Sequence, residues 1–409
     1  MTAISQAPST PDTAAAEAAG DRRARANVLR LAAGQALAGA NASVIFATGA
    51  IIGSTLAPDP SWATVPVSVF VVGMALGPLP TGWLARSSGR RVAFMAGGLA
   101  GVLAGLIGAA ALLVQSFPLY CMATLCGGLY AAVVLSFRFA AADGASPAFR
   151  AKALSWVMAG GVFAGVIGPQ LLNLTMDLWA PNLFVVSYLA HAGVALLAVA
   201  VLSGVDLPRP VRADLEGGRP LAEIMRQPRF LVAVLCGVVS YVLMNLVMTS
   251  APLAMKMCGL PLAASNSAIQ WHVVAMYGPS FFTGSLIARF GAARVVACGL
   301  LLTAGAAGVG LLGITVLHFD AALVLLGLGW NFGFVGASAM VLECHRPEER
   351  TRVQSFNDFL VFGTMALGSF SSGHLLTALG WNAVAAVVFP PVLLALGVLL
   401  ASGRLRKTA

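Results

Sequence analysis

The sequence predicts an all-α membrane protein in which twelve transmembrane helices form two six-helix pseudo-repeat bundles. Three observations predict this fold: an apolar composition, a set of apolar runs long enough to cross a bilayer, and a repeat relating the two halves. Hydrophobic residues make up 59% of the 409 residues and charged residues 10%, whereas a soluble domain carries about 25% charged residues. This composition excludes a soluble enzyme, a disordered chain and a disulfide-stapled scaffold.

The apolar runs give the order of the helices. A bilayer core needs about 20 apolar residues per helix. The runs that meet this length lie at residues 28–53, 62–85, 92–114, 117–139, 152–174, 182–202, 230–251, 263–288, 295–317, 320–342, 355–377 and 383–402. None of them alternates apolar and polar residues as a transmembrane β-strand does, which excludes a β-barrel.

The polar segments divide the chain. Residues 1–27 are rich in Ala, Ser, Thr and Pro and are expected to form a flexible cytoplasmic tail. A cleaved signal peptide is disfavoured, because the apolar run that follows the arginines is long enough to span the bilayer. The remaining segments are an N-terminal bundle (28–202), a cytoplasmic central loop (203–229), a C-terminal bundle (230–402) and a cytoplasmic tail (403–409).

The basic residues predict the orientation. With the N-terminus inside, 23 of the 24 Lys and Arg residues lie on the cytoplasmic side, and only Lys256 does not. Cytoplasmic segments of membrane proteins carry an excess of basic residues, so both termini are expected in the cytoplasm. The net charge of +9 thus reflects topology, and no nucleic-acid partner is expected.

An internal sequence repeat relates the two halves of the chain. Residues 82–89 follow the second predicted helix, residues 284–291 follow the eighth, and both read G-x-L-x-x-x-x-G at an offset of 202. A parallel repeat of six helices is the architecture of major facilitator superfamily transporters. The chain resembles that superfamily over about residues 28–402.

The resemblance extends to short motifs with gating or structural roles. The superfamily's loop motif is matched by Gly82, Leu84, Gly89, Arg90 and Arg91, whereas Arg86 replaces the acid of the standard ion-pair latch. Glycines in the fifth helix resemble a motif for close helix approach, and simple packing explains them equally well. The residues concerned are Gly161, Gly165, Gly168 and Pro169. Asp358, near a cytoplasmic helix end, is expected to make gating contacts or to snorkel.

Sulfur and imidazole side chains form a candidate cargo site. Met244 and Met248 lie four residues apart in the seventh helix, and His272 and Met276 repeat that spacing in the eighth. Residues four apart share a helix face, and consecutive antiparallel helices can bring the two pairs together at similar depth. Thioether and imidazole ligands suit Cu(I), although methionine also serves as a gap filler. Met257 and Cys258 are expected at the entrance and Cys236 toward the exit, as accessory ligands or a redox pair.

This MxxxM and HxxxM pair resembles the CcoA-type copper importers, a branch of the superfamily. The resemblance implies import of copper across a bacterial inner membrane for cytochrome c oxidase assembly. Copper is then cargo, with no permanently bound cofactor. Cytoplasmic copper chaperones and thiol oxidoreductases are candidate partners of a monomer in the lipid bilayer.

Two alternatives remain. The chain could be a facilitator of a small organic solute such as riboflavin or a drug, stacked on aromatic residues Trp271, Tyr277, Phe281 and Trp330. It could also be a scaffold or sensor that transports nothing. The absence of an intramembrane carboxylate cluster disfavours a proton-coupled sugar or cationic-drug transporter. No catalytic motif occurs outside the membrane, so an enzyme is not expected.

Overall fold

The computed structural model describes residues 11–59, 62–207 and 218–405. Within these ranges the chain is helical apart from short connections, and no strand occurs, which confirms the expected all-α fold. Ten helices among the described residues are long and apolar enough to cross a membrane. The two remaining predicted crossings, at residues 263–288 and 355–377, are not among these ten. The first is broken into two helices, and the second is merged with the start of the last crossing.

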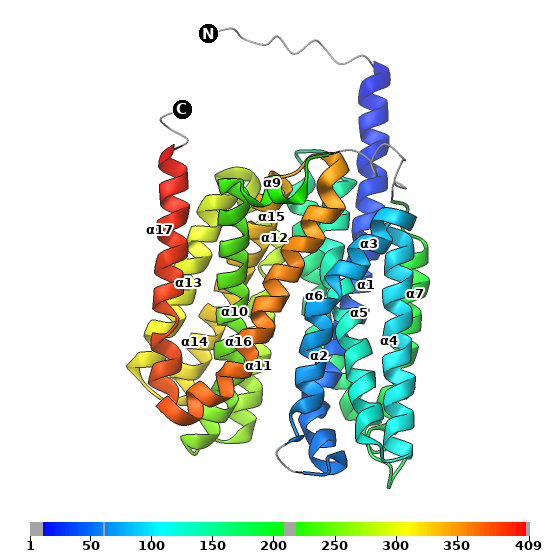
Figure 1. The fold of residues 1–409 in the computed structure, drawn as a ribbon, viewed down its shortest axis with the longest axis vertical. Coiled ribbons are helices and arrows are strands. Elements are labelled where there is room, and N and C mark those ends of the chain that lie inside the picture. The colour runs from blue at the N-terminus through cyan, green and yellow to red at the C-terminus, as the bar shows by residue number, and fades with distance from the viewer. Residues whose placement is uncertain (1–10, 60–61, 208–217, 406–409) are drawn as a thin grey trace.

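The N-terminal half forms one bundle, on the right of Figure 1. Its helices are α1 (Pro11–Leu56), α2 (Val65–Leu76), α3 (Pro78–Ser88), α4 (Arg90–Leu113), α5 (Phe117–Asp143), α6 (Arg150–Thr175) and α7 (Val185–Ser203). Helices α2 and α3 make a single crossing, because Gly77 between them keeps helical backbone angles.

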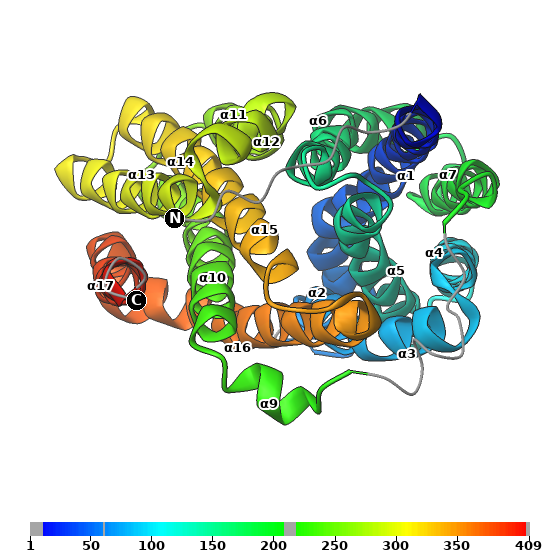
Figure 2. The same cartoon turned by 90° about the horizontal axis from the view of Figure 1, so that it is seen from above.

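The C-terminal half forms the second bundle, on the left of Figure 1. Its elements are α9 (Leu221–Met225), α10 (Pro228–Met257), α11 (Leu262–Tyr277), α12 (Ser280–Phe290), α13 (Ala292–Leu312), α14 (Val316–Trp330), η2 (Asn331–Val335), α15 (Gly336–Leu342), η3 (Pro347–Glu349), α16 (Arg350–Ala386) and α17 (Phe389–Leu405). The bundles meet where α16 packs on α2 and α3, and where α11 and α12 pack on α6 (Figure 2).

Two crossings in the C-terminal bundle are interrupted, and two others are merged into one element. Pro279 separates α11 from α12, because proline lacks the N–H that a continuous helix needs. The five residues of η2 form a π-helical turn between α14 and α15. Helix α16 contains Gly380 with a φ of 80°, a conformation that glycine adopts without strain, and there the eleventh crossing turns into the twelfth.

Several expected boundaries differ from the structure by a few residues, and two of the differences have a clear physical cause. The segment 11–27, expected in a flexible tail, is helical from Pro11. Its alanines are strong helix formers, and near its end Ala24 is buried against the bundle. The ninth helix was expected to reach residue 317 but ends at Leu312, because Gly313 takes an extended conformation that the apolar residues around it conceal. Residues 1–10, 208–217 and 406–409 of the expected tails and central loop lie outside the described residues.

The start of α1 and the end of α17 lie at the same end of the molecule, at the top of Figure 1. We call this the terminal end and the opposite one the far end. The connections from α3 to α4 and from α12 to α13 also lie at the terminal end. Each passes through one glycine of the repeat: Gly89 has φ 93° and ψ 156°, and Gly291 has φ 85° and ψ 149°. The two halves thus share this turn in backbone geometry as well as in sequence.

Candidate functional site

The methionine pair of α10 faces the interior of the C-terminal bundle. On that helix Gly237 lies against Ala337 of α15 and Val361 of α16. Met244 follows seven residues later and therefore points the same way, and its side chain is buried. Met248 continues this face by one turn and is half-buried.

The imidazole of His272 is fully buried in the seam between α11 and α14. Its Nδ1 lies 2.7 Å from the carbonyl oxygen of Leu323. Because a carbonyl only accepts, Nδ1 carries the hydrogen and Nε2 carries a lone pair in the neutral ring. Nε2 is buried with no hydrogen-bond partner among the described residues. The side chain therefore offers one oriented acceptor, which either a metal ion or a hydrogen-bond donor can use.

The four predicted cargo residues lie on α10 and α11, and both of these helices pack on α14. Met276 is buried one turn after His272 and packs where α11 approaches Gly327. In the part of the chain that the structure describes, no group of three or more His, Cys, Asp or Glu side chains is placed to hold a metal ion. A site built from methionines with one histidine stays a prediction.

The accessory residues are spread along α10. Cys236 is buried in the half of α10 nearer the terminal end. Cys258 directly follows the helix at the far end, and beside it the Met257 side chain is 60% exposed. Both cysteines are free thiols, and most of the helix separates them.

Aromatic rings cluster around Tyr241 inside the C-terminal bundle. The Tyr241 ring lies 5.7 Å from that of Trp330, 5.0 Å from that of Phe334 and 5.4 Å from that of Phe362. Tyr277 packs on Trp330 at 5.4 Å. The indole nitrogen of Trp330 is buried without a partner in the described part of the protein, as is the amide nitrogen of Asn245 one turn after Tyr241. We call these five rings and Asn245 the aromatic cluster.

The structure separates the four aromatic residues that the sequence proposed for stacking. Tyr277 and Trp330 belong to the aromatic cluster, whereas Trp271 is 57% exposed and Phe281 is 54% exposed. The neighbours of Trp271 explain this, because His272 faces α14 and Val273 faces α6. Trp271 therefore lies on the face of α11 directed away from both helices.

The aromatic cluster reaches the N-terminal bundle through Tyr277. A Cβ atom at Gly161 of α6 would lie 2.5 Å from Cε1 of this ring, and one at Gly165 would lie 2.6 Å from Val273. The glycines thus allow α6 to approach α11 closely. Pro169, one turn further along, lies inside α6 without ending it.

Two repeat-related glycines bring the bundles together at the terminal end. Gly82 of α3 meets Ser355 of α16, and Gly284 of α12 meets the backbone of α6 at Ala151 and Lys152. These glycines are the first residues of the two sequence repeats, so one motif builds both contacts. The terminal end is closed at both places.

A polar network crosses the interface beside Gly82. Arg90 is ion-paired with Asp143 of its own bundle and bonds Gln354 of α16. The Gln354 amide in turn donates to Asp143 at 3.2 Å. Arg90 therefore joins the bundles, while the position of the missing motif acid is held by Arg86.

Deeper in the interface, Arg138 and Asp358 form an ion pair between α5 and α16. Both side chains are buried, and the Arg138 guanidinium lies 4.3 Å from the Phe139 ring centre and 4.5 Å from that of Phe334. It also donates to Ser338 of α15. Asp358 thus makes a cross-bundle contact, and solvent does not reach it as snorkelling would require.

On the Gly284 side a hydroxyl joins α6 to α12. The Ser155 hydroxyl donates to the Ser280 carbonyl and accepts from the Gly284 N–H at 2.9 Å. Asn331 in η2 supports this corner through 2.6 Å bonds to the Met276 carbonyl and the Ser280 and Thr283 hydroxyls. Asn331 therefore bridges helices, and both N–H donors of its amide are used in doing so.

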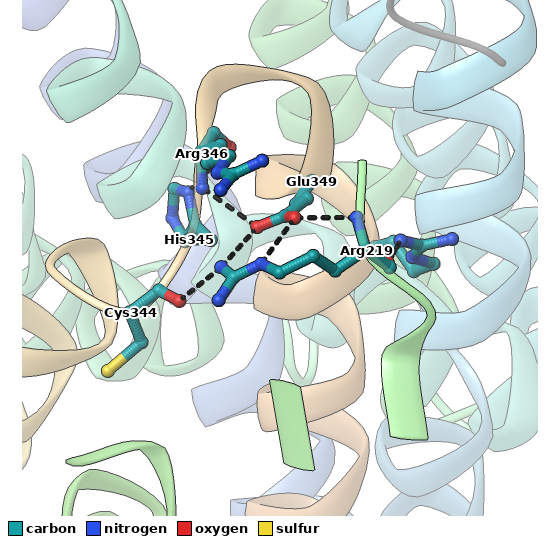
Figure 3. Close-up of polar contacts among 6 residues, drawn as sticks. Arg219, Cys344, His345, Arg346 and Glu349 are labelled. Atoms are coloured by element: carbon teal, nitrogen blue, oxygen red, sulfur yellow. Dashed lines mark hydrogen bonds and ion pairs between the residues drawn. The ribbon is translucent and has the colours of Figure 1, made fainter. Parts of the chain in front are cut away.

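The segment before α9 is clamped to the C-terminal bundle, as Figure 3 shows. The Arg219 guanidinium donates to both carboxylate oxygens of Glu349, at 2.9 and 2.8 Å, and its backbone N–H donates to one of them. The Arg346 N–H adds a fourth bond. These donors hold the pKa of the buried Glu349 carboxyl at about 2, below its ordinary 4.5, chiefly through the Arg219 side chain.

Comparison with known proteins identifies the family. The family model for the Major Facilitator Superfamily matches residues 31–279 and again residues 262–408. The chain belongs to the major facilitator superfamily. The superfamily's repeat is visible in this structure as two bundles. They share the turn at Gly89 and Gly291 and the paired glycine contacts.

Curated members of the superfamily cover most of the chain. The riboflavin transporter RfnT of Brucella anthropi is 47% identical over 377 residues, which are 91% of this chain and 94% of that protein. The uncharacterized MFS-type transporter YdeG of Bacillus subtilis is 29% identical over 86% of each chain. These relatives support a transporter and give no support to the copper branch.

Solved superfamily structures share the fold. The E. coli fucose:proton symporter FucP covers 93% of this chain and 98% of its own, with a TM-score of 0.73 and 14% identity. A bacterial homologue of the iron transporter ferroportin covers 92% and 98%, with a TM-score of 0.70 and 16% identity. At these identities the likeness concerns the fold alone.

Proposed function

We propose that the chain transports riboflavin, or a solute with the same kind of flat polar ring, across a bacterial cytoplasmic membrane by alternating access. The observation that carries this proposal is its 47% identity with a riboflavin transporter over 91% of the chain. The match includes both bundles and therefore the interior that handles cargo. It favours the organic solute over the copper ion to which the sulfur motif points.

The aromatic cluster suits such a cargo. An isoalloxazine ring is flat and aromatic, and stacking or edge contacts with Tyr and Trp favour its binding. Its carbonyl oxygens need donors, which the free N–H groups of Trp330 and Asn245 offer. The buried carboxylate of Asp358 is already paired with Arg138, which fits a cargo without positive charge.

Access follows from the closed terminal end. We assign this end to the cytoplasm because the basic residues gather there. The cargo then enters from the far end, and the bundles rock until the contacts at Gly82 and Gly284 separate. Import from the far end into the cytoplasm is therefore part of this proposal.

Copper is the second candidate, favoured by one observation. His272 presents a buried, oriented Nε2 lone pair one turn from the Met276 thioether, which is a pair of donors that Cu(I) prefers. The two cargoes depend on different side chains, so substitutions distinguish them.

The test is riboflavin uptake by cells that cannot make this vitamin and that express single variants at equal membrane levels. Tyr277→Leu and Trp330→Leu are expected to reduce uptake at least tenfold, since each removes a ring contact and its surface (~1.4 kcal/mol or more). Trp271→Leu and Phe281→Leu are matched controls on exposed faces of the neighbouring helices and should transport normally.

The methionines decide between the cargoes. Met244→Leu should leave riboflavin uptake within about twofold, because leucine nearly conserves the volume. If wild type accumulates copper but no riboflavin, and both Met244→Leu and His272→Leu abolish the copper uptake, the copper candidate replaces the riboflavin proposal.

A further inference from the structure

A cavity of about 740 Å³ opens at the terminal end of the N-terminal bundle, away from the aromatic cluster. It lies between α1, the turn from α3 to α4, and the residues that follow α7. Its wall contains Arg23, Arg90, Arg91 and Asp206, with the apolar side chains of Val92 and Met95 beside them. No step of the proposed transport cycle uses this cavity.

Two of the three arginines in the cavity wall are ion-paired, so the excess positive charge comes from Arg91. Arg23 is ion-paired with Asp206, which cancels the acid in the wall. Arg90 uses only Nη2 for its bonds to Asp143 and Gln354, so its other donors remain available. Arg91 is exposed and forms no ion pair with any residue that the structure describes. The wall therefore offers guanidinium donors to an anion.

The first turn of α4 adds backbone donors to the same wall. Gly89 precedes this helix and has no side chain to cap it, and the first turn contains no acidic residue. The free N–H groups at the start of a helix favour a bound anion, above all a phosphate. These N–H groups therefore add to the attraction of the arginines for an anion.

An apolar stripe leads away from the cavity along α4. Val92, Leu99, Leu103 and Leu106 are each between 45% and 54% exposed. Their spacing of seven, four and three residues places them on one face, and α4 crosses the membrane at the outer edge of the bundle (Figure 2). The stripe therefore faces lipid, and Val92 connects it to the cavity wall.

We propose that this cavity binds the phosphate headgroup of an anionic phospholipid whose acyl chain lies along the α4 stripe. Arginine clusters at the cytoplasmic side of transmembrane helices attract anionic lipids. A free phosphate would use the arginines but not the stripe. The continuity of the two features assigns the site to an amphiphile.

The test titrates purified full-length protein in neutral detergent with phosphatidylglycerol, phosphatidylcholine or inorganic phosphate while its melting temperature is measured. Phosphatidylglycerol is expected to raise the melting temperature of wild type saturably, and the other two should not. Arg91→Gln should weaken the apparent affinity about fivefold, the equivalent of about 1 kcal/mol. Arg91→Lys keeps the charge and should retain most of the response.

The matched control is Arg294→Gln, which removes one charge near the start of α13, the repeat counterpart of α4. It should leave the response to phosphatidylglycerol unchanged. An unchanged affinity in an Arg91→Gln protein that melts like wild type without lipid would overturn the proposal. Equal responses to phosphatidylcholine or to inorganic phosphate would overturn it too.

Discussion

At the scale of single residues, the buried pair of Arg138 and Asp358 dominates the closed interface. Removing one member of a buried ion pair costs about 3–5 kcal/mol, because the other charge is left without compensation. Arg138 keeps its contacts with Ser338 and two aromatic rings in the absence of Asp358, but these are neutral groups. The pair is therefore both a cross-bundle contact and a constraint on charge.

Asp358→Asn is expected to lower the free energy of unfolding by about 3–5 kcal/mol and to weaken the closed state. The measurement is thermal or denaturant unfolding in detergent, with riboflavin uptake recorded in parallel. The double variant Arg138→Met with Asp358→Asn should recover much of the stability, since no buried charge remains. Equal stability of wild type and Asp358→Asn would contradict the ion pair.

The Glu349 carboxylate predicts a pH effect with a definite sign. Its pKa in the folded protein, about 2, lies below the ordinary 4.5, so the ionised group stabilises the fold above pH 4.5 and that stabilisation is lost as the pH falls towards 2. The difference in melting temperature between wild type and Glu349→Gln should therefore be largest at neutral pH and shrink on acidification through this window. Glu348→Gln, the neighbouring control, should show no such trend.

At the scale of elements, the repeat glycines determine how closely the helices of the two bundles approach. A Cβ at position 284 would lie 2.5 Å from the Ala151 carbonyl oxygen and 2.6 Å from the Lys152 Cα, atoms that belong to the backbone of α6 and cannot rotate away. Gly284→Ala must therefore push α12 off α6 and favour the state with the terminal end open.

Alkylation of a single cysteine at position 355, in a protein without its native cysteines, measures this opening. Ser355 packs against Gly82 on the other side of the interface, so its exposure reports the whole terminal end. Gly284→Ala should speed the alkylation several-fold. Gly308→Ala, where a Cβ meets no atom within 4 Å, should not, and equal rates in the two variants would show that the Gly284 contact does not hold the end closed.

The sequence predicted the crossings well but not their interruptions. Runs of apolar residues report a span whether or not the helix is continuous, so the break at Pro279 and the π-helical turn after Trp330 went unnoticed. The end of α13 was misplaced for the same reason, since Ile314 and Leu317 extend the apolar run beyond Gly313. Hydrophobicity indicates which residues lie within the membrane, whereas the helix breaks depend on backbone geometry.

The candidate site was harder to predict than the fold. Met244 and Met248 share a spacing that a single helix displays, so the sequence revealed their common face. The aromatic cluster joins Tyr241, Trp330 and Phe362 from three helices distant in the sequence, and Tyr241 had no local signal. The sequence allowed gating contacts at Asp358 but did not reveal its partner Arg138, because only packing brings residues 220 positions apart together.

At the scale of the whole molecule, the low content of charged residues and the internal repeat explain the membrane location and the two-bundle architecture. Composition requires a membrane, and the repeat of 202 residues yields two bundles that meet through equivalent glycines. The same low charge leaves few groups to handle cargo: sulfur, one imidazole, aromatic rings and amides. The spacing of the methionines is visible in the sequence, and it favoured copper as the cargo. The riboflavin transporter at 47% identity favours a flavin, for which the aromatic cluster is the candidate binding site.

The most direct test of this account is uptake by proteoliposomes that contain only the purified protein, with radiolabelled riboflavin and copper offered separately. The account predicts saturable riboflavin uptake that unlabelled riboflavin competes away, that excess copper does not inhibit and that Trp330→Leu loses. Copper uptake without riboflavin uptake by the same active preparation would contradict it.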